Sequence, residues 1–137
     1  MNTPVIIDSS ALFALVSQDD SNHEQAVEVS GRLSETQRAV VLLSEVFAET
    51  LNIVGKKLGR PQQLALAREV LDSRDFIFSD ETPQMRENAV TKLSQQPGSV
   101  SYTDALVMAF ADLYNSRLIF GFDDVFRKNG YLLPTNG

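Results

Sequence analysis

The stretch Val5-Ile6-Ile7-Asp8-Ser9-Ser10-Ala11-Leu12 decides the fold. Its first three residues are β-branched, and an apolar run without polar alternation is typical of a strand that is covered on both faces. Strands of that kind belong to parallel sheets with helices on each side. Asp8 ends the strand, and the serines after it suit either a turn or the start of a helix.

Apolar runs of the same kind recur along the chain and are separated by longer stretches with helical spacing. Together with the first they predict five strands, at Val5–Ile7, Ala39–Leu43, Phe76–Phe78, Leu118–Phe120 and Tyr131–Leu133. Alternating strands and helices are typical of the α/β class. The sequence therefore predicts an α/β protein with a parallel sheet of about five strands flanked by helices.

Capping residues and helix stops mark the helices between these strands. The expected helices begin near Ser21, Ser44, Pro61, Pro83 and Ser101. The first and last of them open with patterns that resemble capping boxes, Ser21-Asn22-His23-Glu24 and Ser101-Tyr102-Thr103-Asp104. Because no repeat, low-complexity tract or long linker interrupts the pattern, we expect one domain over residues 1–137.

Composition narrows the classes of function. A net charge of -6 and a pI near 4.7 argue against a protein that binds nucleic acid by general neutralisation of phosphates, but not against an enzyme acting on nucleic acid. The absence of cysteine excludes disulfides and thiolate zinc sites. Without a long apolar run or a basic segment after Met1, we expect a cytoplasmic protein with no membrane partner.

Acidic residues follow two of the predicted strands. Asp8 comes directly after the first, and Asp123 with Asp124 comes shortly after Leu118–Phe120. In open α/β sheets ligands bind outside the carboxyl ends of the strands, so these acids mark the place to look for a site. Asp104 lies in the first turn of the helix that leads to the second of these strands.

Each acid also has a purely structural interpretation. Asp8 could be only a helix N-cap, Asp104 could be only the reciprocal member of a capping box, and Asp123 with Asp124 could favour the next helix N-terminus. The functional interpretation depends on the set, because like charges that converge at one edge are costly unless a cation holds them.

Glu45 and Glu49 lie four residues apart on one helix. Helical geometry places Glu49 beside Val46 and Ile53, at the border of the apolar surface, and Glu45 on the more polar side. We therefore expect Glu49 to be partly buried and to point inward, and Glu45 to be solvated.

The acidic motifs together resemble those of the PIN-domain nucleases, and most of all the small prokaryotic toxin nucleases of the VapC type. The resemblance runs from Val5 to about Leu133. Four segments carry it in the family's order: Val5–Leu12, Val46–Asn52, Ser101–Ala105 and Phe122–Phe126. It implies a three-layer α/β sandwich and a metal-dependent endoribonuclease.

The resemblance also implies which residues form the site. Asp8, Glu49, Asp104 and Asp123 match the family's acidic quartet, which is both the catalytic and the metal-binding set. Ser9 matches the hydroxyl residue after the first Asp, and Asp124 matches an additional acid that some members have. Gly121 departs from the pattern, since the family commonly has Thr or Ser two positions before the last Asp.

Oxygen ligands without histidine or cysteine suit Mg²⁺ or Mn²⁺ better than zinc. Such an ion can polarise a water and neutralise charge at the phosphate. We expect Asp8 and Asp104 to be direct ligands, with Glu49 and Asp123 acting through water or orienting the attacking water.

Two groups of basic residues could attract the substrate. Arg127 and Lys128 are nearest in sequence to the expected edge, and we expect them to bind substrate phosphates. Lys56, Lys57 and Arg60 form a second cluster at a helix C-terminus, where compensation of the helix dipole is the preferred interpretation.

The leading hypothesis is the toxin of a toxin–antitoxin pair, with RNA as substrate, a small antitoxin protein as partner and a homodimer as the assembly. A chain with little beyond the catalytic domain suits this hypothesis. The alternatives are a housekeeping RNA-processing or DNA-acting PIN nuclease, a catalytically idle PIN-like binding module, and a phosphoaspartyl receiver-like domain. The last would need a lysine after a later strand, and the sequence offers no convincing one.

Overall fold

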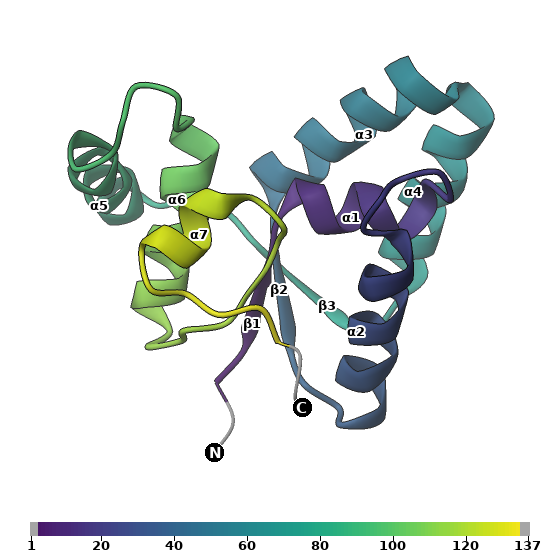
Figure 1. The fold of residues 1–137 in the computed structure, drawn as a ribbon, viewed down its shortest axis with the longest axis horizontal. Helices are drawn as coiled ribbons and strands as arrows, with labels where there is room; N and C mark the ends of the chain where they lie inside the picture. Colours follow the sequence, from purple (N-terminus) through teal and green to yellow (C-terminus); the bar gives the residue numbers. More distant parts are fainter. Residues whose placement is uncertain (1–2, 135–137) are drawn as a thin grey trace.

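The computed structural model describes residues 3–134, in which each of the first three strands is followed by two helices and the fourth by one (Figure 1). The elements are β1 (Val5–Ile7), α1 (Ser9–Val16), α2 (His23–Glu35), β2 (Val40–Leu43), α3 (Ser44–Leu58), α4 (Arg60–Asp72), β3 (Phe76–Ser79), α5 (Pro83–Ser94), α6 (Tyr102–Leu113), β4 (Ile119–Phe120) and α7 (Asp124–Lys128).

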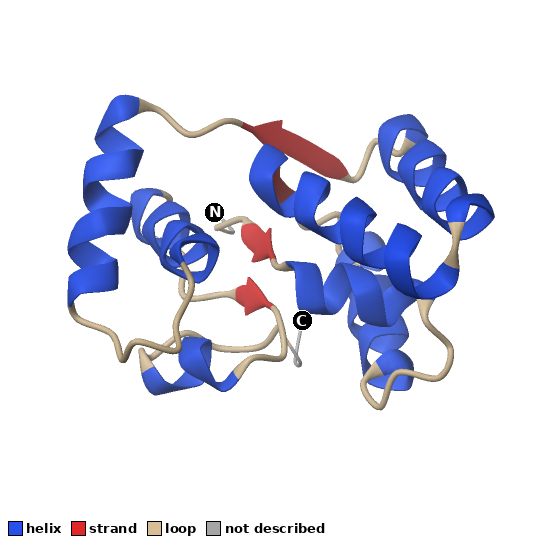
Figure 2. Cartoon of the chain, turned by 90° about the horizontal axis from the view of Figure 1, so that it is seen from above, coloured by secondary structure: helices blue, strands red, loops and turns tan. Residues whose placement is uncertain are grey.

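The four strands form one parallel sheet in the order β3-β2-β1-β4. The helices α1, α2 and α4 lie on one side of it and α5 and α6 on the other, with β3 at an outer edge (Figure 2). The predicted α/β architecture with a parallel sheet between helices is confirmed. Because β1 and β4 are neighbours, whatever follows these two strands is brought together at one end of the sheet.

The core explains why the strands are unbroken apolar runs. Every residue of β1, β2 and β4 is buried, since helices cover both faces of the sheet. Helix α6 is buried from Ala105 to Ala111, and it contacts α5, β1 and β4. An all-apolar helix of this kind lies inside a protein rather than at its surface. It also fixes the position of its own first turn, where Asp104 lies.

The prediction of about five strands was wrong by one, because the run Tyr131–Leu133 forms only a single parallel bridge between Leu118 and Leu132. The N–H of Tyr131 donates to the carbonyl of Phe126 at 3.0 Å, which closes the turn after α7 and removes that group from the ladder. The Tyr131 hydroxyl then donates to Asp112 Oδ1 at 2.7 Å. The run is therefore anchored by a buried side chain and a single bridge, and it does not form a strand.

Of the two predicted capping boxes, one is present and the other is not. The capping box at the start of α6 is present, with both reciprocal hydrogen bonds between Ser101 and Asp104. The box expected at Ser21 is not formed, because α2 begins at His23 and its N-cap is Asn22 without a side-chain cap bond. Instead the carboxylate of Asp20 accepts the N–H of Asn22 at 2.8 Å. Within residues 3–134, no helix has the length and apolar character needed to span a membrane.

Candidate functional site

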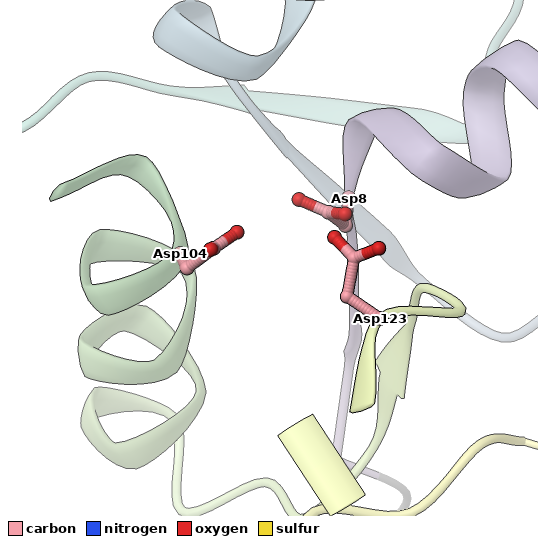
Figure 3. Close-up of side chains that lie close together, drawn as sticks. All are labelled: Asp8, Asp104 and Asp123. Carbon is pink, nitrogen blue, oxygen red and sulfur yellow. The ribbon is translucent and has the colours of Figure 1, made fainter. Parts of the chain in front are cut away.

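Three aspartates from separate parts of the chain meet at the carboxyl end of the sheet. Asp8 follows β1, Asp123 follows β4, and Asp104 lies in the first turn of α6. Each offers a carboxylate oxygen, and these oxygens all lie within 4.8 Å of one another. Figure 3 shows Asp104 projecting from α6 toward the other two carboxylates. We call Asp8, Asp104 and Asp123 the aspartate cluster.

Asp8 and Asp104 serve as helix caps and as members of the cluster at once. Asp8 is the N-cap of α1, and its Oδ2 accepts the N–H of Ser10 at 3.3 Å. Asp104 Oδ2 accepts the N–H of Ser101 at 3.2 Å, while its own N–H donates to Ser101 Oγ at 3.1 Å. The structural interpretation of these residues is therefore correct, and it explains how the two side chains are held in place.

The cluster is electrostatically strained without a cation. Asp8 is only 1% exposed, and burial raises the pKa of its carboxyl to about 7, with the negative charges of Asp123 and then Asp104 adding to the effect. The pKa of Asp123 is also raised, first by partial burial and then by the charges of Asp104, Glu49 and Asp124. Where carboxylates converge, their mutual repulsion favours the protonated, neutral form. A bound cation would instead favour the charged form.

Ser10 is a residue of this site that the sequence did not single out. Its hydroxyl donates to Asp8 Oδ2 at 2.9 Å, and Ser10 Oγ accepts the backbone N–H of Phe122 at 2.9 Å. It thus connects the segment that carries Asp8 with the segment that carries Asp123. The spacing of two residues from an N-cap aspartate is the signal that could have indicated it. Ser9, the hydroxyl suggested by the family motif, lies instead beside the cluster on the wall of a cavity.

Gly121 is required by the close approach of the two acid-bearing segments. A Cβ at this position would lie 2.8 Å from Asp8 Cβ and 3.0 Å from Cε2 of Phe126. The backbone beside Asp8 cannot move freely, because the N–H of Asp8 donates to the carbonyl of Phe120 at 2.9 Å. A Thr or Ser at position 121, as is common in the family, does not fit this arrangement.

The two glutamates of α3 are both half-buried. Glu49 is not one of the residues whose oxygens lie within 4.8 Å of one another, but it is near enough for its charge to raise the pKa of Asp123. Glu45 was expected to be solvated, yet its Oε2 is buried and has no hydrogen-bond partner among the described residues. Its charge contributes, after burial and Glu81, to the raised pKa of Tyr102 on α6.

The basic residues after Asp123 differ in their surroundings. Arg127 is partly buried, and its guanidinium donates to the carbonyls of Ile119, Gly121 and Tyr131. Lys128 is exposed at the end of α7, and Asp124 is exposed at its start. Arg127 therefore holds the backbone on either side of α7, whereas Lys128 faces solvent.

A cavity of about 370 Å³ adjoins the cluster, because its wall includes Asp123 and also Ser10, the hydrogen-bond partner of Asp8. Its wall comes from α1, the segment before α2, α3 and the segment after β4; we call it the side pocket. It is lined by Ser9, Ser10, Phe13, Asp20, Asn22, Ile53, Lys57, Phe122 and Asp123. A second cavity of about 330 Å³ is more apolar in lining, lies between α1, α2, α4 and the sheet, and does not include a residue of the cluster.

The aspartate cluster fits a hard divalent cation. Its donors are carboxylate oxygens only, the chain has no cysteine, and the single histidine, His23, lies 2.6 Å from the carbonyl of Ala14 through Nδ1 instead of joining the cluster. Oxygen donors of this kind are the ligands that Mg²⁺ and Mn²⁺ prefer in proteins.

Comparison with known proteins assigns the family. The model of the PIN domain family matches residues 5–130, and the chain belongs to this family. Among solved structures, VapC20 from Mycobacterium tuberculosis, described as a toxin that cleaves the sarcin-ricin loop, superposes with a TM-score of 0.80. The two chains are 22% identical, and the match covers 93% of this chain and 96% of that chain, which confirms the PIN-like fold. Curated protein sequences give no significant match.

Proposed function

We propose that this protein is a metal-dependent endoribonuclease that cleaves RNA phosphodiester bonds at the aspartate cluster. The observation that carries the proposal is the convergence of three carboxylates, one just after β1, one after β4 and one in the first turn of α6, with the buried Asp8 among them. Carboxylates whose pKa values are raised by burial and by one another are typical of functional sites. Membership of the PIN domain family supports nuclease chemistry.

Asp8, Asp104 and Asp123 would hold the cation, Mg²⁺ or Mn²⁺. When bound, such an ion polarises water and neutralises charge on the phosphate oxygens. Asp8 must lose its proton to take part, and the hydrogen bond from Ser10 favours that charged form and fixes its orientation. Glu49, whose charge acts on Asp123, would orient the attacking water or contact the ion through water.

We further propose that the protein acts in the cytoplasm as the toxin of a toxin–antitoxin pair, as a homodimer with a small antitoxin protein as partner. The structural similarity to VapC20 supports this assignment. A neighbouring reading frame for a small DNA-binding protein would supply the partner. Co-purification of its product with this chain, together with loss of cleavage in the complex, tests the assignment.

The nuclease activity is tested with purified protein and a labelled single-stranded RNA. We expect cleavage with Mg²⁺ or Mn²⁺, none in EDTA, and none by an Asp104→Asn variant with Mg²⁺. A DNA strand of the same sequence serves as the second substrate. Cleavage that persists in EDTA would contradict the metal mechanism, and preference for DNA would favour the DNA-acting alternative.

A further inference from the structure

We propose that the side pocket binds a nucleotide of the RNA next to the scissile phosphate, and that Lys57 pairs with the phosphate on that side. This inference rests on the proposed function and extends it to how the substrate strand is held. The pocket begins at the cluster itself, because Asp123 belongs to both and Ser10, which also lines the pocket, donates a hydrogen bond to Asp8. A strand whose phosphate lies at the cluster would therefore have its adjoining nucleotide at this pocket.

The volume and lining of the side pocket suit one nucleotide. At about 370 Å³ it lies within the range of roughly 300 to 1,000 Å³ that is typical of small-molecule sites. Phe13 and Phe122 provide apolar ring surface, and both are only partly buried. Asn22, which makes no side-chain cap bond, brings an amide that can hydrogen-bond a base edge. Aromatic and amide side chains of this kind are typical of sites for single-stranded RNA.

Among residues 3–134, Lys57 is the only basic residue on the pocket wall. Its Nζ lies 5.4 Å from the centre of the Phe13 ring, so the ammonium is held over the pocket and not directed away from it. Within residues 3–134 it forms no ion pair, although the acidic Asp20 and Asp123 line the same pocket. An ammonium without an anionic partner in a protein of net charge -6 is available for a phosphate.

Compensation of the α3 dipole does not account for this position. Lys56 and Lys57 both lie in the last turn of α3, and both are exposed, so they share that role. Only Lys57 lines the side pocket, because the two side chains leave the helix about 100° apart. Lys56 is therefore a matched control for charge, exposure and helix position.

The test measures RNA binding with and without each charge. A fluorescent single-stranded RNA is titrated with the protein carrying Asp104→Asn, which prevents cleavage, in Mg²⁺ buffer at several salt concentrations. Lys57→Gln should weaken binding for all sequences and lower the slope of log affinity against log salt by about 0.7, the value for one phosphate contact on a single strand. Lys57→Arg should keep the slope, and Lys56→Gln should leave affinity and slope unchanged.

Repeating the series in EDTA without the Asp104 change, with thermal melting of each variant, separates binding from folding. One outcome is that the parent protein binds and cleaves RNA while Lys57→Gln and Lys56→Gln show equal affinities and slopes. That result would overturn the proposed role of the side pocket but not the proposed nuclease activity. If the parent protein neither binds nor cleaves RNA in any buffer, the proposed function fails first.

Discussion

The hydroxyl of Ser10 lies 2.9 Å from Oδ2 of Asp8, and it is the donor that holds the buried carboxylate in place. Ser10 Oγ also accepts the N–H of Phe122, 112 residues along the chain. One side chain thus sets the distance between two of the three members of the aspartate cluster. Since groups that orient metal ligands usually affect the ligands they hold, we expect cleavage to be sensitive to a change at Ser10.

Ser10→Ala should lower cleavage by about 10- to 100-fold and reduce stability by about 1 to 2 kcal/mol. The N–H of Phe122 loses its acceptor, and Asp8 loses a bond that favours its charged form. The pKa of Asp8 should rise further, so the pH at which activity appears should move upward. The pH–rate profile checks this prediction, with Ser9→Ala as the control. An unchanged profile for Ser10→Ala would remove Ser10 from the site.

The raised pKa of Asp8 predicts how stability depends on pH without metal. Between the ordinary value of 3.8 and about 7, the folded protein holds a proton on Asp8 that the unfolded chain has already released. The free energy of unfolding should therefore fall by a few kcal/mol in total as pH rises through that window. Above the window it should level off. Urea unfolding in EDTA across pH 4 to 8 measures this contribution. Other carboxyl groups also contribute to the pH dependence of stability, so the contribution of Asp8 is the difference between the parent protein and Asp8→Asn.

Asp8→Asn should abolish cleavage while the fold survives. Asparagine is as good an N-cap as aspartate, so the start of α1 is kept while one charge leaves a crowded cluster. In metal-free buffer at pH 8 the variant should melt no lower than the parent protein, and its stability should lose the pH dependence described above. Strong destabilisation would show instead that Asp8 is needed chiefly as a cap.

Gly121→Ala should reduce stability by about 1 to 3 kcal/mol, since the added Cβ would lie 2.8 Å from Asp8 Cβ. The clash should also move Asp8 relative to Asp123, so cleavage should fall at every Mg²⁺ concentration. Gly31→Ala is the control, because a Cβ at that exposed position in α2 meets nothing within 4 Å. Denaturant unfolding of both variants gives the comparison. A stable and fully active Gly121→Ala protein would mean that the two segments are less tightly packed than described.

Arg127→Lys should lower stability and cleavage together, whereas Lys128→Gln should leave stability within about 0.5 kcal/mol. A single ammonium cannot reproduce the geometry by which the guanidinium reaches the carbonyls of Ile119, Gly121 and Tyr131. Thermal melting and RNA binding at several salt concentrations distinguish a structural role of Arg127 from a role in binding substrate phosphates. A weaker salt dependence at unchanged melting temperature would mean that Arg127 binds substrate phosphates, as its sequence position first suggested.

The sequence predicts the positions of those site residues that depend only on nearby residues in the chain. Asp8 lies where an apolar strand ends, and Asp104 lies in a capping box that the sequence pattern shows directly. Both positions follow from neighbours within a few residues. The strand order that makes β1 and β4 adjacent, and so brings Asp123 to Asp8, does not follow from neighbours in the sequence.

Contacts between distant segments could not be predicted in this way. The bond from Phe122 to Ser10 and the close approach of Gly121 to Asp8 depend on how two loops meet. Periodicity on α3 gave the apolar side of the helix, but it could not show that Glu45 would be covered and would lie near Tyr102. In the same way, apolarity at Tyr131–Leu133 indicated burial, although a side-chain anchor and not a strand provides it.

The two glutamates of α3 give the last prediction, because both are half-buried and only the charge of Glu49 acts on the pKa of a residue of the cluster. Glu49→Gln should lower cleavage at limiting Mg²⁺ by about 10- to 100-fold, since its charge acts on Asp123. Glu45→Gln should leave cleavage nearly unchanged. It should also be neutral or stabilising, because it replaces a carboxylate whose Oε2 has no partner with an uncharged amide. Initial rates measured against Mg²⁺ concentration for both variants decide between them. Equal curves, or a larger defect for Glu45→Gln, would transfer the metal-orienting role from Glu49 to Glu45.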